Sequence, residues 1–590
     1  AEYTTSENFI RVNALRNLMI ARGWDAVVLR GCDPHGSEYP ASRWKQVEWL
    51  SGFTGEAGDL VITLDHAGLW TDTRYFIQAN IQLEGSGVVL HKTRVPEQVL
   101  IPEWIAAESR GSTDYMVAVD GLCVSAGFAA SLQGVTVVSV PDMLDIFWKD
   151  RPAVPQTPVF EINSGESRSE KIAWLREVLS ENDCDAILLS ALDDIAWMLN
   201  FRASDIEYNP LVISYLLVTQ EKVEWFVKKD GPGPAGWPDD IRVLPYSSLQ
   251  MQLGTDADYT GRLWLDENSL NFELARFFAD NNFDTITRPS PVQLRKAVKN
   301  ELEIKMMKES HLRDGIAMEK FLFWLDKSLE KGETISEKDA ADYLGTMRSR
   351  IGDYMGDSFA TISAYGKGAA LPHYITPSAN APLLERKGLY LCDSGGQYLS
   401  GTTDITRTVP LGACTQLEKE DYTLVLKGHI DLATAVFPSG TAGCQIDALA
   451  RIPLWKSGRN FGHGTGHGVG FFLGCHEGPQ DVRQNFNPTT LLPGMVISDE
   501  PGIYREGLHG VRHENLLLVC EAGSDEFGYW LKFEPLTLCH FDTSIIESKL
   551  LNEEEKQWLN SYNERVYNTL SPYLEGEILG WLKEKTKAVQ

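Results

Sequence analysis

The sequence predicts an α/β (α+β) protein in which two related α/β domains precede a larger C-terminal domain. Apolar residues at helical spacing lead twice into a short β-rich segment, DAVVL at residues 25–29 and DAILL at residues 185–189. A proline-rich stretch at residues 151–158 and the segment Pro289-Ser290-Pro291 interrupt this pattern, as linkers do. We therefore expect three domains, over residues 1–155, 156–290 and 291–590.

The two N-terminal domains also continue alike after these segments. WLSGF follows the first segment at residues 49–53, and WMLNF follows the second at residues 197–201. Each then leads into an apolar, β-rich stretch, DLVITLDHAGLWT in the first copy and PLVISYLLVT in the second. The shared order indicates an internal repeat.

The C-terminal domain mixes helical and strand-like sequence. Residues 299–329 combine strong helix formers with apolar residues three and four positions apart, which predicts a long helix. Residues 355–540 contain apolar runs broken by glycine, which predict short strands. From about residue 545 the sequence is helical again, with Asn552 as a suitable N-cap for EEEKQWLNSYNERVYNTL.

Composition excludes several classes of function. The 590-residue chain has a formal net charge of −28 at pH 7, which opposes binding to nucleic-acid phosphates and to anionic membranes. No apolar stretch reaches the ~18–20 residues of a transmembrane helix, and the residues before the first expected helix do not resemble a signal peptide. The nine cysteines form no CxxC pair, which is typical of free thiols in a reducing compartment. We expect a cytoplasmic protein that binds neither nucleic acid nor membranes.

Two stretches of the C-terminal domain offer aspartates and histidines as metal ligands. LCDSGGQYLSGTTDITRT contributes Asp393 and Asp404, although aspartates beside glycines are, taken alone, more often turn residues. FGHGTGHGVGFFLGCHEGP contributes His463, His467 and His476. His463 and His467 have the i, i+4 spacing of a zincin helix, but the glycines disfavour a helix and the glutamate of HExxH is missing. A glycine-rich loop or short strand, where the backbone approaches a ligand closely, is the better interpretation.

A third stretch, ISDEPGIYREGLHGVRHENLLLV, contributes two glutamates. Glu500 precedes a Pro-Gly turn, and Glu514 stands at the start of an apolar, strand-like run. A carboxylate that enters a buried strand is costly unless it is paired, hydrogen-bonded or bound to a metal. Arg512 lies two residues before Glu514, so an Arg512–Glu514 ion pair is the competing interpretation.

Together these stretches offer two Asp, two Glu and one His as ligands. Oxygen-rich ligation with a single imidazole suits hard or borderline divalent ions such as Mn²⁺. Four carboxylates around one ion would leave excess negative charge. Two ions roughly 3.5–4 Å apart, with two bridging carboxylates, balance that charge. The pattern therefore favours a dinuclear metal site.

The order Asp, Asp, His, Glu, Glu, with TTDITRT, HGTGHGVG, DEPG and RHEN, resembles that of the pita-bread metallopeptidases. YGKGAALPHY around His373, WLSGFTGEAGDLVITLDHAGLWTDTRYFIQA and DDIAWMLNFRASDIEYNP are similar to the three-domain Xaa-Pro aminopeptidases (aminopeptidase P) of that family. The resemblance covers essentially the whole chain. It implies two creatinase-like N-terminal domains, followed by a pita-bread catalytic domain with a helical C-terminal extension.

The resemblance also implies roles for the ligands. Asp393 would bind one metal, Asp404 and Glu514 would bridge both, and His467 and Glu500 would complete the second. A hydroxide between the metals would attack the scissile carbonyl, with Glu500 as the general base. The non-ligand histidines of the family correspond to His373, His463 and His476. These three would bind the proline residue and the scissile carbonyl, and His476 would assist proton transfer. Arg512 would orient the carboxylates.

The resemblance further implies the cofactors and partners. We expect two divalent ions, most readily Mn²⁺, with Zn²⁺ or Co²⁺ as alternatives. The substrates would be peptides with proline in the second position, and the protein would form a homodimer. The nearest alternative is prolidase, an Xaa-Pro dipeptidase that shares the metal site but usually has one N-terminal domain. A catalytically inactive pita-bread scaffold that binds proteins is the other alternative, although such relatives generally lack some of the five ligands.

Overall fold

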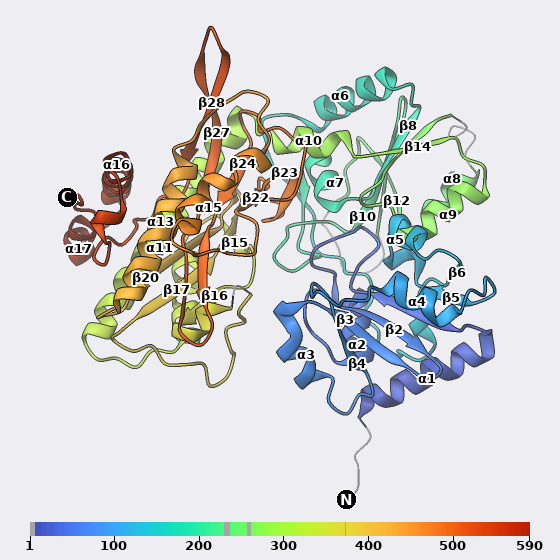
Figure 1. The fold of residues 1–590 in the computed structure, drawn as a ribbon. Coiled ribbons are helices and arrows are strands. Elements are labelled where there is room, and N and C mark those ends of the chain that lie inside the picture. The colour runs from blue at the N-terminus through green and yellow to red at the C-terminus, as the bar shows by residue number, and fades with distance from the viewer. Residues whose placement is uncertain (1–5, 229–235, 256–260, 372) are drawn as a thin grey trace, which may run out of the picture. The chain divides into compact units, whose positions relative to one another are not determined.

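The computed structural model describes residues 6–228, 236–255, 261–371 and 373–590 and is drawn in Figure 1. The chain divides into two compact units. The first comprises Ala1–Glu207 and Leu211–Val292, and the second comprises Tyr208–Pro210 and Gln293–Gln590. The domain boundaries expected near residues 155 and 290 stay predictions.

The first unit contains two six-stranded sheets of the same topology. The first sheet consists of β1 (Ala26–Arg30), β2 (Asp59–Thr63), β3 (Ala67–Thr71), β4 (Val89–Lys92), β5 (Met116–Val119) and β6 (Thr136–Ser139). The second consists of β8 (Ala186–Leu189), β10 (Ser214–Thr219), β11 (Val223–Val227), β12 (Arg242–Pro245), β13 (Leu263–Asp266) and β14 (Thr285–Arg288). Their strand orders are β4-β3-β2-β1-β5-β6 and β12-β11-β10-β8-β13-β14.

The pairing of these strands confirms the internal repeat. In both sheets the fourth strand in the order, β1 or β8, pairs antiparallel with the third and parallel with the fifth. The DAVVL and DAILL segments supply these two strands. The stretch from residue 151 to residue 158, which was expected to be a linker, contains no helix or strand.

The helices of the first unit repeat a local stop signal. They are α1 (Glu7–Arg22), α2 (Gln46–Ser51), α3 (Phe76–Gln82), α4 (Ile101–Ser109), α5 (Ala126–Ser131), α6 (Arg168–Glu181), α7 (Leu192–Leu199), α8 (Leu249–Thr255) and α9 (Phe272–Asp280), with the short strands β7 (Phe160–Glu161) and β9 (Phe201–Arg202). Helix α2 ends at Gly52 with φ 82°, and helix α7 ends at Asn200 with φ 60°. Glycine and asparagine tolerate this left-handed conformation, so WLSGF and WMLNF terminate equivalent helices.

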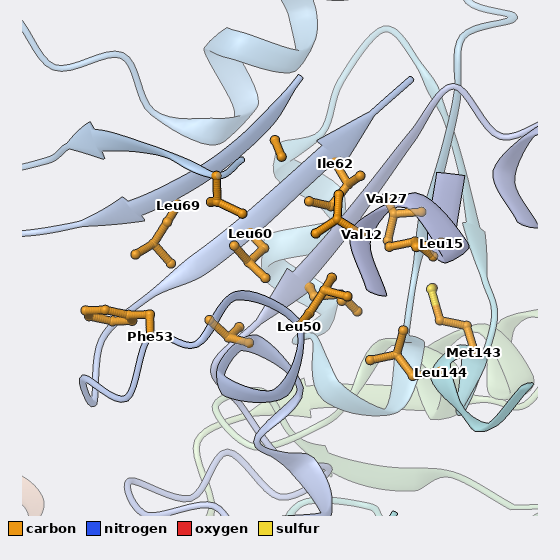
Figure 2. Close-up of a cluster of buried hydrophobic side chains, with 14 of the residues drawn as sticks. Val12, Leu15, Val27, Leu50, Phe53, Leu60, Ile62, Leu69, Met143 and Leu144 are labelled. Carbon is orange, nitrogen blue, oxygen red and sulfur yellow. The ribbon is translucent and has the colours of Figure 1, made fainter. Parts of the chain in front are cut away.

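A buried cluster under the first sheet shows how α1 is held (Figure 2). Apolar side chains on one face of the helix pack against the apolar face of the strands. The helix places such side chains three and four residues apart, and the strands place them at alternate residues. The residues labelled in Figure 2 are Val12, Leu15, Val27, Leu50, Phe53, Leu60, Ile62, Leu69, Met143 and Leu144.

The second unit combines long helices with several small sheets. Its helices are α10 (Pro291–Ala297), α11 (Glu301–Glu330), α12 (Glu337–Ser349), α13 (Gln416–Ala433), α14 (Gly443–Ile446), α15 (Ala448–Trp455), α16 (Glu553–Leu570) and α17 (Glu577–Lys585). Its strands are β15 (Tyr354–Asp357), β16 (Ile362–Tyr365), β17 (Leu389–Ser394), β18 (Gly396–Tyr398), β19 (Gly401–Thr402), β20 (Ile405–Pro410), β21 (Val436–Pro438), β22 (Gly466–Gly468), β23 (Glu477–Val482), β24 (Val496–Asp499), β25 (Gly502–Arg505), β26 (His509–Arg512), β27 (Asn515–Asp525) and β28 (Gly528–Pro535).

The strands form one six-stranded sheet, β21-β28-β27-β24-β22-β23, and two three-stranded sheets, β16-β17-β20 and β15-β18-β19, with β25-β26 as a separate hairpin. Helices α13 and α15 pack on the six-stranded sheet through the cluster that contains Leu432, Ala450 and Ile497. Helices α11 and α12 pack on β17 and β20 through the cluster that contains Phe321 and Tyr390. The β27–β28 hairpin projects from the rest of the unit (Figure 1).

The expectation of short strands over residues 355–540 is wrong for part of that range. Residues 416–433 form the 18-residue helix α13, and α14 and α15 follow it. Thr415 caps α13 in a capping box with Glu418, so the local signal for a helix was present. Glycines on both sides of this segment obscured it.

The other helix predictions are confirmed. Helix α11 begins after Asn300 in a capping box with Glu303, as residues 299–329 indicated. Asn552 caps α16 with Glu555 in the same way. Helix α16 packs on α13, and α17 packs on α11, where Trp581 contacts Phe323. Among the described residues, no helix is both long and apolar enough to cross a membrane.

A carboxyl pair joins α13 to α16. Burial and the hydrogen-bonded carboxyl of Glu555 raise the pKa of Asp431 to about 8, while Lys427 and Lys456 oppose the rise. Lys427 Nζ lies 2.6 Å from Glu555 Oε1. The folded-state pKa of Asp431 therefore exceeds the unfolded value of about 3.9. Its stabilising contribution is complete below about pH 4 and is lost as the pH rises through about 8.

We expect the melting temperature of the wild type to fall more between about pH 6 and about pH 9 than that of Asp431→Asn, because the amide cannot ionise beside Glu555. Thermal unfolding of both proteins at the two pH values measures the difference. Asp342→Asn, which removes an exposed carboxylate beside Lys338, is the matched control and should follow the wild type. Parallel curves for Asp431→Asn and the wild type would contradict the assignment.

Candidate metal centre

The five predicted ligands stand at or beside strand ends of the second unit. Asp393 lies in β17, and Asp404 directly precedes β20, the strand that pairs with β17. His467 lies in β22, which confirms the short strand expected in the glycine-rich stretch. Glu500 directly follows β24, and Glu514 stands between β26 and β27. A backbone bridge between Thr406 and Glu514 ties the two parts of the unit together at this point.

Four of the predicted ligands converge. Ligand atoms of Asp404, His467, Glu500 and Glu514 all lie within 4.8 Å of one another. The imidazole atom His467 Nε2 is 3.2 Å from Asp404 Oδ2 and 3.5 Å from Glu500 Oε2. Asp393 is not part of this group, but it is close enough for Asp404 and Glu500 to influence its ionisation.

Several atoms of these residues are buried without a hydrogen-bond partner among the described residues. They are Asp393 Oδ1, His467 Nε2 and Glu514 Oε2. Buried polar atoms are nearly always paired, because an unpaired one keeps the full cost of leaving water. Carboxylate oxygens and an imidazole nitrogen are the donors that divalent cations such as Mn²⁺ and Zn²⁺ accept. The residues therefore fit a metal centre.

The pKa values of the clustered carboxyl groups also favour a bound cation. Burial raises the pKa of Asp393 to about 7, with Asp404 and Glu500 adding to the rise and Arg512 opposing it. Burial and the same carboxylates raise the pKa of Glu514 well above its ordinary value. Burial also disfavours the ionised form of Glu500, but the neighbouring Glu514 and His467 side chains hold its pKa below the ordinary value. Without a cation, burial and mutual repulsion thus oppose the ionisation of Asp393 and Glu514.

Arg512 does not pair with Glu514, so the competing ion-pair interpretation is wrong. Its guanidinium donates to Asp393 Oδ2 at 3.1 and 2.8 Å and to the hydroxyl of Tyr504 at 2.9 Å. Glu514 Oε1 instead accepts a hydrogen bond of 2.8 Å from the hydroxyl of Thr406. Arg512 therefore orients a carboxylate, as expected, and that carboxylate is Asp393.

The three predicted substrate histidines have different surroundings. His463 Nε2 lies 2.6 Å from the hydroxyl of Tyr504, and burial lowers the pKa of His463 to about 4. The exposed ring of His476 lies 4.4 Å from that of His467, centroid to centroid, and His476 forms a second group of metal-binding type with Asp404 and His467. His373 is exposed, and its role stays a prediction.

Sequence reasoning missed Tyr504. Its hydroxyl lies between His463 and Arg512, so it links a predicted substrate residue to the group that orients Asp393. Burial raises the pKa of Tyr504 to about 12, which keeps the hydroxyl protonated at neutral pH. Tyr504 stands two residues after the Pro-Gly turn, but a single tyrosine carries no signal of this kind in the sequence.

Comparison with known proteins gives matches over nearly the whole chain. The model of metallopeptidase family M24 matches residues 305–521, and the model of the C-terminal region of peptidase M24 matches residues 529–589. Two models of the creatinase/prolidase N-terminal domain match residues 11–151 and 150–303.

Individual relatives cover the chain from end to end. A protein named probable Xaa-Pro aminopeptidase P from Talaromyces marneffei is 39% identical, over 100% of this chain and 94% of that protein. Its counterpart from Laccaria bicolor is 37% identical, over 98% of this chain and 92% of that protein. The crystal structure of X-prolyl aminopeptidase from Caenorhabditis elegans, described as a cytosolic enzyme with a di-nuclear active site, superimposes with a TM-score of 0.91 and 33% identity, over 99% of this chain and 100% of that chain.

The crowding of carboxylates predicts an unusual response to Glu514→Gln. The variant without metal should melt at or above the temperature of the metal-free wild type, because an amide cannot acquire the buried charge that its neighbours repel. Mn²⁺ at a hundredfold excess over its dissociation constant should raise the melting temperature of the wild type by about 5 °C and that of the variant much less.

Glu521→Gln, which changes an exposed glutamate on β27, is the control for Glu514→Gln and should respond to Mn²⁺ like the wild type. Two results would contradict the assignment of Glu514. One is a metal-free Glu514→Gln that melts several degrees below the metal-free wild type. The other is a full response of that variant to Mn²⁺.

Proposed function

Because the chain belongs to the M24 metallopeptidase family, we propose that it is a two-metal aminopeptidase that removes an N-terminal residue preceding proline. The matches also confirm the predicted fold, with creatinase-like N-terminal domains and a C-terminal M24 catalytic domain. The main support for this activity is the buried cluster of carboxylates and one imidazole, in which several ligand atoms have no hydrogen-bond partner in the described part of the chain.

The arrangement supports different roles for the proposed ligands, some bridging both ions and others binding one ion. Asp404 and Glu514 are the proposed bridging carboxylates, since both lie in the converging group and Glu514 has one oxygen held by Thr406 and one unpaired. Asp393 would help to hold one ion, and His467 with Glu500 would help to hold the other. When bound, two divalent cations supply Lewis acidity to the scissile carbonyl and lower the pKa of the attacking water.

The chain's own residues then hold the substrate and move protons. The ionised carboxylate of Glu500 would act as the general base that accepts a proton from the attacking water. Neutral His463, fixed by its hydrogen bond to Tyr504, offers an uncharged contact to the substrate. His476, next to His467, is placed to bind the scissile carbonyl or to pass a proton to the leaving nitrogen. Exposed His373 completes the proposed proline-binding set.

Finer assignments follow from the same chemistry. Oxygen-rich ligation favours Mn²⁺ over Zn²⁺ or Co²⁺. All nine cysteines are free, which agrees with a reducing compartment, and the relative from Caenorhabditis elegans is described as cytosolic. We place this chain in the cytoplasm on that basis, and we propose a homodimer as its assembly.

Peptide length separates the main function from its nearest alternative. We expect Xaa-Pro-Yaa tripeptides to be cleaved with a kcat/KM at least about tenfold above that for Xaa-Pro dipeptides, because an aminopeptidase site accommodates chain beyond the proline. The assay uses chelated protein reloaded with Mn²⁺, Co²⁺ or Zn²⁺. A preference for the dipeptides would assign the chain to the prolidases instead.

The inactive-scaffold alternative has its own test. Asp404→Ala and the chelated wild type should both lose activity by about a thousandfold or more, since each removes the source of the nucleophile. Reloading with metal should restore the wild type only. Unchanged activity after chelation, or in Asp404→Ala, would contradict the two-metal mechanism, and wild-type protein that binds metal but cleaves no peptide would favour the scaffold.

A further inference from the structure

The loop between β22 and β23 is held rigidly beside the proposed metal ligands. Both backbone polar groups of Leu473 are hydrogen-bonded. Its N–H donates to Thr402 Oγ1 at 3.2 Å, and its carbonyl accepts from Gln397 Nε2 at 2.6 Å. The N–H of Gly474 donates to Glu477 Oε2 at 2.8 Å. Three side chains from outside the loop therefore fix its backbone just before Cys475.

Two further features show that the conformation of this loop is tightly constrained. Glu477 is itself anchored by Lys296, whose Nζ lies 2.6 Å from Glu477 Oε1 in a buried ion pair. Phe472 is fully buried at φ 47°, a left-handed conformation that is strained for a bulky residue. Such strain persists only where the surroundings leave the chain no alternative. The next side chain along the loop thus has a well-defined position.

That side chain is the thiol of Cys475, and it points at a proposed metal ligand. Cys475 is 2% exposed, and its Sγ donates to Asp404 Oδ2 at 3.3 Å. The same oxygen lies 3.2 Å from His467 Nε2, the nitrogen left without a hydrogen-bond partner. The thiol therefore contacts the Asp404 oxygen that lies beside His467.

Cys475 completes a pattern among the carboxylates. Asp393 receives hydrogen bonds from Arg512, and Glu514 receives one from Thr406. Asp404 receives its own from Cys475. Each of these three carboxylates thus has one oxygen fixed by a side-chain donor from another part of the chain. Donors of this kind set the rotation of a ligating carboxylate, and removing them typically lowers metal affinity about 10- to 100-fold.

We infer that Cys475 is the positioning residue for Asp404, and that its S–H···O hydrogen bond fixes the bridging carboxylate for two cations. The inference deepens the proposed function and rests on it. A neutral thiol suits this oxygen better than a charged donor. Arg512 neutralises part of the negative charge of Asp393, whereas a weak thiol donor leaves the charge of Asp404 available to the cations.

The test compares donor-free and donor-retaining variants of the full-length protein. Cys475→Ala removes the donor, and Cys475→Val removes it while filling the thiol's space. Cys475→Ser keeps a hydroxyl donor. Cys444→Ala is the matched control, because that thiol donates to the backbone carbonyl of Asn487 and not to a proposed ligand. Thermal unfolding of each metal-free protein checks that the variants fold.

Mn²⁺ binding to the chelated proteins is then measured by calorimetry and electron paramagnetic resonance. We expect two ions in the wild type and in Cys444→Ala. Cys475→Ala and Cys475→Val should bind Mn²⁺ about 10- to 100-fold more weakly, and Cys475→Ser should recover most of that loss. At saturating Mn²⁺, the donor-free variants should lower kcat with little change in KM, because the thiol orients a ligand and touches no substrate.

The outcomes separate this inference from the proposed function. A wild type that binds no Mn²⁺ overturns both. A wild type that binds two ions, with unchanged affinity in Cys475→Ala and Cys475→Val, overturns the positioning role and leaves the proposed function standing. Co²⁺-loaded wild type should lack an intense sulfur-to-cobalt charge-transfer band. A band of that kind, lost in Cys475→Ser, would make the sulfur a ligand and overturn the inference.

Discussion

The repulsion among carboxylates buried at one point is the constraint on which the rest of the catalytic unit depends. Asp404, Glu500 and Glu514 converge with His467, and Asp393 lies near enough to feel their charge. Taking such groups out of water is costly, and only part of that cost is offset by Arg512 and hydrogen bonds. Two divalent cations bound by these residues, as proposed, would offset the remaining repulsion.

The scaffold around the cluster meets this constraint with rigid strands. Asp393 and Asp404 are brought together by the antiparallel pairing of β17 and β20, while the bridge from Thr406 to Glu514 brings in the segment before β27. Side-chain donors from distant parts of the chain then fix individual oxygens. The result is a preformed arrangement of the carboxylates on rigid strands.

Local signals in the sequence were enough for the repeat and for the capped helices α11 and α16, and they picked out four residues that converge in the structure. Glu514, directly before an apolar strand, is informative because burying a charge is costly unless the charge is paired or bound to a metal. Contacts between distant segments were not accessible in this way. Arg512 and Glu514 are two residues apart and share a face of an extended chain, so a local pair was plausible. The partner of Arg512 is Asp393, 119 residues away, and the contacts of Tyr504 and Cys475 likewise exist only in the folded chain.

Anomalous diffraction from Mn²⁺-soaked crystals of the full-length protein, recorded on both sides of the manganese absorption edge, tests the dinuclear centre most directly. The proposed dinuclear centre requires two peaks roughly 3.5–4 Å apart, both in contact with Asp404 and Glu514. One peak should also contact Asp393, and the other His467 and Glu500. A single peak, or two peaks of which neither touches Glu514, would contradict it.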